Sequence, residues 1–240
     1  MPAPQGTIHE IEFQSNELGE ILTILIYLPA NYSPLYKYSL VIAQDGKDYF
    51  QMGRLARFAD ELLAEQAIGN VIIAGIPYKS VKDRRRKYHP DGEENPAYIR
   101  FLAHELLPYL DKEYPTYQMG SSRTLMGSSL GASVSLMAAA KYPNIFGQVI
   151  LQSPFVNEQI LETVRSHPAP HLLDVYHVIG KEETEVKTTD GKVKDFLAPN
   201  RRLHDLFVEK GFHTFYEEFD GGHTWKYWQP DLKRAMEKML

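Results

Sequence analysis

Cysteine is absent from the 240-residue sequence. Its absence excludes a disulfide framework, a cysteine nucleophile and thiolate metal sites, and it fits a reducing compartment. The first residues, MPAPQGTIHEIEF, contain neither a basic region nor an apolar core, so they do not predict a signal peptide. No apolar run approaches the length of a membrane span. We therefore expect a soluble, cytoplasmic protein without a membrane partner.

An excess of positive charge is also lacking, because the formal net charge is -5. Such a chain has no basic field for binding nucleic acid, and we expect no nucleic-acid partner. The exception is the basic run at 82–87 (KDRRRK), which is either a solvated surface or a region that attracts a charged substrate. The histidines show no HExxH spacing, so we expect no metal. A homo-oligomer is left open without being indicated.

Hydrophobic residues make up 43% of the chain, which is enough for a large core. Short β-rich runs alternate with helical patterns almost from end to end, and this alternation predicts one α/β domain over residues 1–240. We expect a mostly parallel eight-stranded sheet flanked by helices on both faces. Residues 77–97 are polar and predict a long, cap-like surface loop. The expected strands are 8–13, 21–28, 40–44, 70–76, 124–126, 148–153, 175–179 and 214–219; the expected helices are 53–65, 98–114, 130–142, 158–165, 200–210 and 231–240.

A serine lies at the junction of one such strand and helix. The sequence Gly127-Ser128-Ser129-Leu130-Gly131 matches G-x-S-x-G and separates a short apolar strand from an alanine-rich helix. A sharp turn in this context presents a serine side chain above the carboxyl edge of the sheet, at a helix N-terminus that favours negative charge. The simpler interpretation is a plain structural turn. The choice between them depends on whether a base and an acid follow.

The candidate base is His223, which follows two glycines between the last strand and the last helix. The chain order serine, acid, histidine is the one that this architecture uses; the alternative is a histidine that caps the final helix. An acid that orients the histidine should follow the strand at 175–179. Spacing alone does not rank the carboxylates in that region, which are Glu182, Glu183, Glu185, Asp190 and Asp195.

A possible oxyanion site follows the strand at 40–44, where the chain reads Gln44-Asp-Gly-Lys-Asp-Tyr-Phe50. A tight turn at this strand end would direct a second backbone N–H toward an oxyanion, beside that of Leu130. The alternative is an ordinary Asp-Gly turn. The aromatic residues Tyr49, Phe50 and Trp225 could line a compact substrate pocket, and Arg85 could contact a charged substrate.

Four segments together make the chain resemble the family of α/β-hydrolases named Putative esterase, which includes esterase D, enterobactin-type siderophore esterases, feruloyl esterases and mycolyltransferases. They are Gln44-Asp-Gly-Lys-Asp-Tyr-Phe, Gly127-x-Ser129-x-Gly131, Ile179-Gly-Lys-Glu-Glu and Gly221-Gly-His-Thr-Trp-Lys-Tyr-Trp228. The resemblance implies the α/β-hydrolase fold, Ser129 as nucleophile, His223 as base and the backbone N–H of Lys47 as an oxyanion donor. It points to Glu183 as the acid, with Glu182 and Glu185 as alternatives because many members have aspartate there.

The resemblance further implies ester hydrolysis through an acyl-enzyme on a small-molecule substrate, without a cofactor. No segment resembles a large apolar lid, so we expect short-chain or small aryl esters. The alternatives are a hydrolase of siderophore lactones or other anionic esters, and a thioesterase or acyltransferase of the same fold. A catalytically silent binding module is a more remote alternative.

Overall fold

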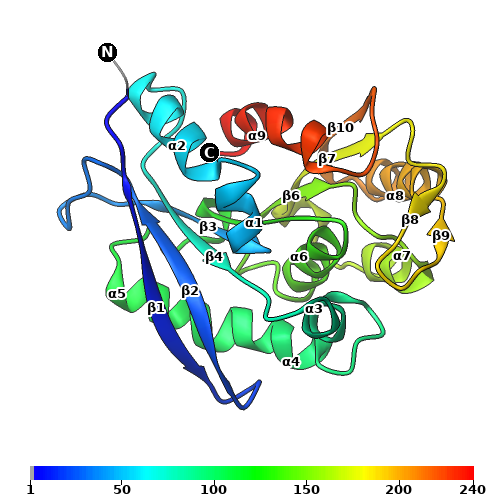
Figure 1. Ribbon diagram of the computed structural model, residues 1–240, viewed down its shortest axis with the longest axis horizontal. Helices are drawn as coiled ribbons and strands as arrows, with labels where there is room; N and C mark the ends of the chain where they lie inside the picture. The colour runs from blue at the N-terminus through cyan, green and yellow to red at the C-terminus, as the bar shows by residue number, and fades with distance from the viewer. Residues whose placement is uncertain (1–2) are drawn as a thin grey trace.

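The computed structural model describes residues 3–240 and contains an eight-stranded sheet in the order β1-β2-β4-β3-β5-β6-β7-β10 (Figure 1). Strand β1 pairs antiparallel with β2, β2 pairs antiparallel with β4, and all other neighbours in the sheet are parallel. The predicted α/β fold with a mostly parallel eight-stranded sheet is confirmed. The strands are β1 (Thr7–Ser15), β2 (Glu20–Leu28), β3 (Ser39–Gln44), β4 (Val71–Ile76), β5 (Arg123–Ser128), β6 (Gln148–Gln152), β7 (Asp174–Gly180) and β10 (His213–Phe219).

Helices connect the parallel strands, as right-handed crossovers between neighbouring parallel strands require. A separate two-stranded hairpin, β8 (Val186–Lys187) with β9 (Val193–Lys194), follows β7 and was not predicted. The helices are α1 (Gly46–Gln51), α2 (Leu55–Ala64), α3 (Val81–Tyr88), α4 (Asn95–Arg100), the π-helical η1 (Phe101–Leu106), α5 (Leu107–Glu113), the 3-10 turn η2 (Gly120–Ser122), α6 (Leu130–Lys141), α7 (Glu158–Arg165), the 3-10 turn η3 (Pro170–Leu172), α8 (Leu197–Lys210) and α9 (Trp225–Met239).

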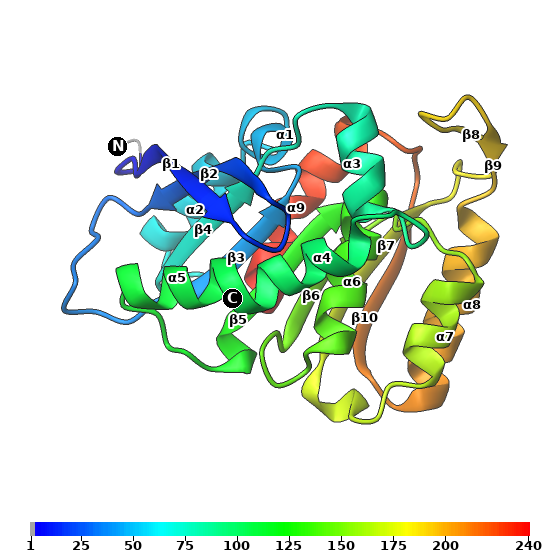
Figure 2. The ribbon, with the colours of Figure 1, turned by 90° about the horizontal axis from the view of Figure 1, so that it is seen from below.

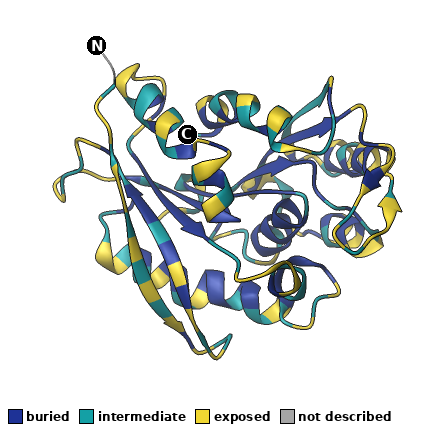
Figure 3. Ribbon diagram, in the orientation of Figure 1, coloured by how far each residue is buried: buried dark blue, intermediate teal, exposed yellow. Residues whose placement is uncertain are grey.

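The core forms two layers because successive side chains of a strand point to opposite faces of the sheet. In β3, Leu40 and Ile42 pack into one hydrophobic cluster and Val41 and Ala43 into the other. Helices α4 to α8 cover the first face, while α1, α2 and α9 cover the second (Figure 2). The central strands are therefore buried on both sides, whereas β1 at the edge is largely exposed on one side (Figure 3).

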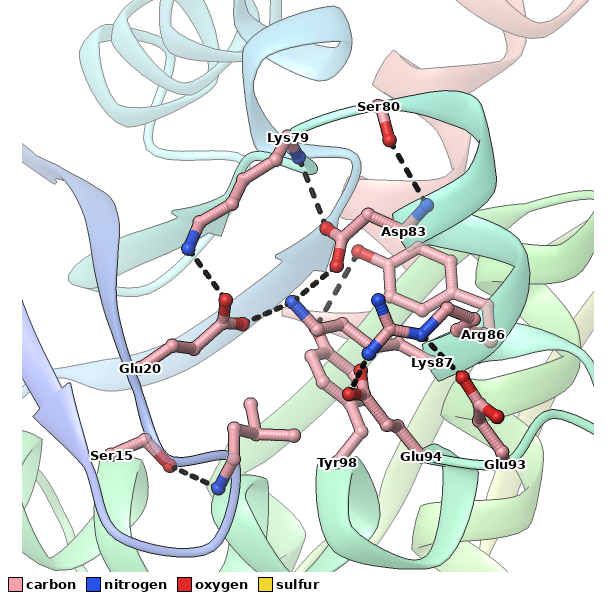
Figure 4. A network of polar contacts seen from close by, with 12 residues as sticks. Ser15, Glu20, Lys79, Ser80, Asp83, Arg86, Lys87, Glu93, Glu94 and Tyr98 are labelled. Atoms are coloured by element: carbon pink, nitrogen blue, oxygen red, sulfur yellow. Dashed lines mark hydrogen bonds and ion pairs between the residues drawn. The ribbon is translucent and has the colours of Figure 1, made fainter.

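The prediction of a long loop at residues 77–97 is wrong, because the basic run forms helix α3. Ser80 caps this helix by accepting a hydrogen bond from the Asp83 N–H at 3.1 Å, and the Asp83 carboxylate accepts one from the Lys79 N–H at 3.1 Å. Lys87 is buried between Glu20, in strand β2, and Asp83 (Figure 4). These contacts fix α3 to the start of β2, so the segment is an ordered wall of the molecule.

Other boundaries differ by local causes. The expected helix at 98–114 begins earlier, at Asn95, and includes the π-helical segment η1. The expected helix at 231–240 also begins earlier, at Trp225, because Pro230 is accommodated inside the helix. Within residues 3–240, no helix combines the length and apolar character needed to cross a bilayer.

Candidate active site

Ser129 occupies a strained turn at the carboxyl edge of the sheet. It follows β5 directly, precedes α6, and has φ 54° and ψ −122°, a conformation that side chains other than glycine rarely adopt. Strand β6 and helix α6 hold the turn in place. The Ser129 N–H donates to the Gln152 carbonyl at 2.9 Å, and the Ser129 carbonyl accepts from the Ser133 N–H at 3.1 Å. The side chain is thereby presented at the N-terminus of a twelve-residue helix.

The two glycines of the motif are required by close packing. A Cβ atom on Gly127 would lie 2.3 Å from the carbonyl carbon of Gly131, so any larger residue would push helix α6 off the strand. A Cβ on Gly131 would lie 3.0 Å from the Asp45 carboxylate. The G-x-S-x-G spacing therefore brings the helix against both β5 and the segment that follows β3.

His223 and Glu183 form a close pair beside this turn. His223, in the loop between β10 and α9, has its Nδ1 2.6 Å from Oε2 of Glu183. The carboxylate accepts there, so Nδ1 carries the proton and Nε2 is the unprotonated nitrogen of the neutral ring. Among the carboxylates that spacing left open, Glu183 is the one that the structure places against His223. Glu182, Glu185 and Asp195 are exposed, and Asp190 accepts a hydrogen bond from Thr188.

Glu183 is completely buried, and its second carboxylate oxygen is also hydrogen-bonded. Oε1 accepts from the Ser153 hydroxyl at 2.6 Å and from the Gly180 N–H at 2.9 Å. Ser153 in turn accepts from the Trp228 indole N–H at 2.9 Å. A buried carboxylate is costly unless it is hydrogen-bonded, and these donors stabilise its ionised form. The sequence did not indicate this role for Ser153, because the expected strand at 148–153 included it, whereas β6 ends at Gln152.

A cavity of about 90 Å³ joins Ser129 to His223. No hydrogen bond links the Ser129 hydroxyl to the imidazole within residues 3–240, and such contacts often tighten only when substrate binds. The walls come from α3, the start of α6, the loop after β6 and the β8–β9 hairpin. The lining residues are Arg84, Arg85, His89, Ser129, Leu130, Phe155, Val186, Lys187, Thr188, Thr189, Lys194, Phe196 and His223.

Lys47 and Leu130, the two candidate oxyanion donors, lie in the first turns of helices α1 and α6. Strands β3 and β5 are parallel neighbours, so α1 and α6 start at the same sheet edge. The turn into α1 uses Asp45 at φ 54° and Gly46, where a Cβ would lie 2.3 Å from the Gly75 carbonyl carbon. The first N–H groups of a helix have no partner within it. The expected turn after β3 is therefore the first turn of a helix.

Arg84 joins this second turn to the Ser129 turn. Its guanidinium donates from Nε to Oδ1 and from Nη2 to Oδ2 of Asp45, at 2.7 and 2.6 Å, and Nη2 also lies 3.2 Å from the Ser128 carbonyl oxygen. A two-pronged guanidinium–carboxylate contact of this kind fixes orientation as well as distance. The sequence singled out Arg85 in the basic run, and the structure places Arg84 beside it in the cavity wall as well.

The predicted aromatic substrate contacts lie elsewhere. Tyr49 is completely buried, donates from its hydroxyl to the Gln152 side chain at 3.1 Å, and packs edge to face on Trp225. Phe50 packs beside Gly75. None of these three lines the cavity, because Tyr49 and Phe50 on α1 and Trp225 at the start of α9 pack into the second hydrophobic layer. The aromatic walls are instead Phe155 and Phe196, which follow β6 and the β8–β9 hairpin.

Comparison with known proteins places the chain in a family. A family model described as Putative esterase matches residues 15–239. The chain is 53% identical to the uncharacterized protein YjcH of Bacillus subtilis (strain 168) over 100% of both chains. It is 22% identical to an acetyl esterase of Caldicellulosiruptor saccharolyticus, with 97% of each chain covered. The enterobactin esterase of Shigella flexneri superposes with a TM-score of 0.84 at 18% identity, over 99% of this chain and 59% of that one.

The family model covers nearly the whole chain, and the structural neighbour shares its fold despite low identity. The resemblance inferred from the four sequence segments is thus confirmed. The chain belongs to the Putative esterase family and is a carboxylic ester hydrolase with the α/β-hydrolase fold.

Proposed function

We propose that this protein is a serine carboxylesterase in which Ser129, His223 and Glu183 form the catalytic triad. The observation that carries the proposal is the 2.6 Å contact between His223 and the buried Glu183, facing a cavity that also exposes Ser129 on its strained turn. This arrangement supplies the parts that acyl transfer requires, namely a nucleophile, a base and an orienting acid.

In the proposed reaction, Ser129 Oγ attacks the ester carbonyl carbon while His223 Nε2 takes the hydroxyl proton. The carbonyl electron pair moves to oxygen, and the backbone N–H groups of Leu130 and Lys47 stabilise the oxyanion. Collapse of this intermediate breaks the ester C–O bond, and the imidazolium gives its proton to the departing alcohol. Water then attacks the acyl-enzyme with the same base, which releases the acid and restores Ser129.

Glu183 remains ionised throughout this cycle. It holds the imidazole with Nδ1 protonated and stabilises the imidazolium that forms in each half-reaction. Its bonds from Ser153 and Gly180 leave one oxygen free for His223, so the ring has one favoured orientation.

The cavity supports a small acyl group. Its volume of about 90 Å³ is small beside the roughly 300–1,000 Å³ of typical ligand pockets. Leu130, Phe155 and Phe196 provide apolar wall for a few methylene groups, each worth about 0.8 kcal/mol when buried. The acetyl esterase among the sequence relatives is a further argument for a short acyl group. We therefore propose short-chain or small aryl esters as substrates.

Labelling with a fluorophosphonate tests the triad. The wild-type protein is expected to react at one site and Ser129→Ala not to react, while both keep the same circular dichroism spectrum. Labelling of Ser129→Ala at the wild-type rate would show that another residue is the nucleophile. A wild-type protein that fails to react would favour the silent binding module.

A panel of p-nitrophenyl esters from acetate to palmitate tests the chain length, with a siderophore lactone and a thioester alongside. We expect kcat/KM to peak between acetate and about hexanoate and to fall beyond about C8, where no further wall is available. A higher kcat/KM for palmitate than for butyrate would contradict this proposal.

A further inference from the structure

The catalytic cavity carries charge of one sign. Among the described residues that line it, Arg84, Arg85, Lys187 and Lys194 are cationic at neutral pH, and no lining residue is a carboxylate. The chain as a whole has a net charge of -5. The four cations around this cavity of about 90 Å³ therefore contrast with the net negative charge of the whole chain.

Nearby carboxylates neutralise only part of this charge. Asp45 pairs with Arg84, as described above. Arg85 and Lys194 share Asp190, at 3.5 and 3.7 Å between the nearest nitrogen and oxygen atoms. Lys187 forms no ion pair within residues 3–240. Within the described residues, Asp45, Asp190 and the Glu183 carboxylate behind His223 are three acids against the four cations, which leaves an excess of one positive charge.

Two further features strengthen the positive potential at the cavity. The first turn of α6 directs backbone N–H groups toward it, and a helix N-terminus carries about half a positive charge. Low-dielectric walls of Phe155 and Phe196 reduce screening around the same space. The ammonium of Lys194 lies 4.6 Å from the centre of the Phe155 ring, which orders this cation at the rim.

We propose that the substrate of this site is a small ester that carries a negatively charged group a few bonds from the scissile carbonyl. Arg85, Lys187 and Lys194 would bind the charged group, while the apolar walls hold the remaining carbons. This inference rests on the proposed ester hydrolysis at Ser129 and specifies its substrate class. The charged group is on either the acid part or the alcohol part, and the experiment separates these two cases.

Two pairs of esters matched in size provide the test, with hydrolysis followed by pH-stat titration. For the acid part, monomethyl succinate is compared with methyl 4-oxopentanoate; for the alcohol part, acetoxyacetate is compared with acetoxyacetone. Each rate is divided by the rate of alkaline hydrolysis to remove intrinsic reactivity. We expect kcat/KM to be roughly tenfold or more higher for the anionic member of at least one pair. The ratio of kcat/KM values should decrease when the salt concentration is raised from about 20 mM to about 0.5 M, because the Debye length shortens.

Single variants locate the effect. Arg85→Gln and Lys187→Gln are expected to lower the anionic-to-neutral ratio several-fold. Lys82→Gln is the matched control, because it removes one exposed positive charge from the same helix outside the cavity, and it should keep the wild-type ratio. If Lys82→Gln lowered the anionic-to-neutral ratio as much as the cavity variants do, the effect would come from the overall charge of the protein, and the proposal would be overturned.

Equal kcat/KM values for the anionic and the neutral ester in both pairs would also overturn the proposal. The same holds if Ser129 is labelled by the fluorophosphonate but neither anionic ester is hydrolysed faster than its neutral partner. Failure of the proposed function is distinguishable, because then Ser129 does not react with the fluorophosphonate and none of the four esters is hydrolysed.

Discussion

At the scale of single residues, the site depends on how each side chain is held. Glu183 is buried in contact with His223, whereas Glu182 next to it is exposed. The two glutamates are adjacent and chemically identical, so they form a natural pair of test positions. The difference between them is one of environment alone.

We expect Glu183→Gln to lower kcat by several orders of magnitude, because an amide does not stabilise the imidazolium and favours the wrong ring tautomer. Glu182→Gln and Glu185→Gln should stay within about twofold of wild type, since solvated charges contribute little. Steady-state hydrolysis of p-nitrophenyl butyrate measures all three. Equal, mild effects would transfer the role of the acid to another carboxylate, such as Asp190 or Asp195.

Ser153 is the positioning residue that supports Glu183 from behind. Ser153→Ala removes one donor to the carboxylate and leaves the Trp228 indole N–H without its acceptor. We expect kcat to fall about tenfold, about 1.4 kcal/mol in activation free energy, with KM nearly unchanged.

Ser153 has φ 49°, so a backbone control is required. Ser153→Gly relieves the strain of that conformation but also lacks the hydroxyl, and it should lose as much kcat as the alanine variant. Wild-type kcat in the glycine variant would show that the hydroxyl is not required and that the alanine variant loses activity through a change in its backbone.

At the scale of elements, helix α3 connects the two turns of the active site. Its Arg84 side chain is 15% exposed and pairs with Asp45, which is 3% exposed, while Arg85 beside it is 41% exposed and 3.5 Å from its partner. Neighbouring arginines on one helix therefore make a buried and a solvated ion pair. This difference predicts unequal contributions to stability.

Arg84→Met is expected to lower the free energy of unfolding by about 3 kcal/mol, because it leaves the Asp45 carboxylate buried without a partner. Arg85→Met should cost less than about 1 kcal/mol. Urea denaturation at pH 7 measures both variants. Similar losses of unfolding free energy in the two variants would mean that the ion pair of Arg84 contributes no more to stability than the ion pair of Arg85.

The elements that sequence reasoning located are those with local signals. The alternation of apolar runs predicts β3 to β7, and helix α7 is found at its predicted bounds, Glu158–Arg165. Helix α3 was missed because its residues read as a charged surface. Its order comes from the Ser80 cap and from Glu20, which is distant in sequence.

The same limit applies to the site. The G-x-S-x-G motif and the glycines before His223 are local, so they led directly to the residues that the structure brings to one cavity. Phe155 and Phe196 reach the cavity only through tertiary packing, and no spacing in the sequence indicates them. Arg84 belongs to the basic run at 82–87 that the sequence indicates as a region for a charged substrate, but its pairing with Asp45 depends on tertiary packing. Tyr49 was misplaced because a predicted turn is in fact the helix α1.

At the scale of the whole molecule, buried histidines link stability to pH. His177 in β7 is completely buried, and its Nε2 lies 2.7 Å from the Asn200 side-chain oxygen. Burial, the largest cause, lowers the pKa of His177 from 6.5 to about 4 in the folded protein. Between these values the unfolded chain binds a proton that the folded protein does not, so the stabilisation is complete above about pH 6.5 and is lost as the pH falls toward 4.

This shift corresponds to as much as about 3 kcal/mol at about 1.4 kcal/mol per pKa unit. His177→Gln cannot be protonated in this range, so its free energy of unfolding should decline less than that of wild type between pH 7 and 4.5. Urea denaturation at several pH values measures this, with His171→Gln, at an exposed position, as the control. Parallel curves for His177→Gln and wild type would contradict the prediction.

The backbone around Glu183 has a consequence for how such an enzyme changes over evolution. The Glu183 carbonyl accepts hydrogen bonds from the N–H groups of Phe196 and Leu197, at 2.8 and 3.1 Å, which close the ends of the segment 184–195 into a loop. That loop supplies three cavity residues at 187–189 as well as Val186 and Lys194, yet both of its ends are anchored at the acid. Insertions or deletions inside it can therefore remodel substrate choice while the catalytic frame stays in register, which makes this loop a natural place for lineages to diverge and for grafting in the laboratory.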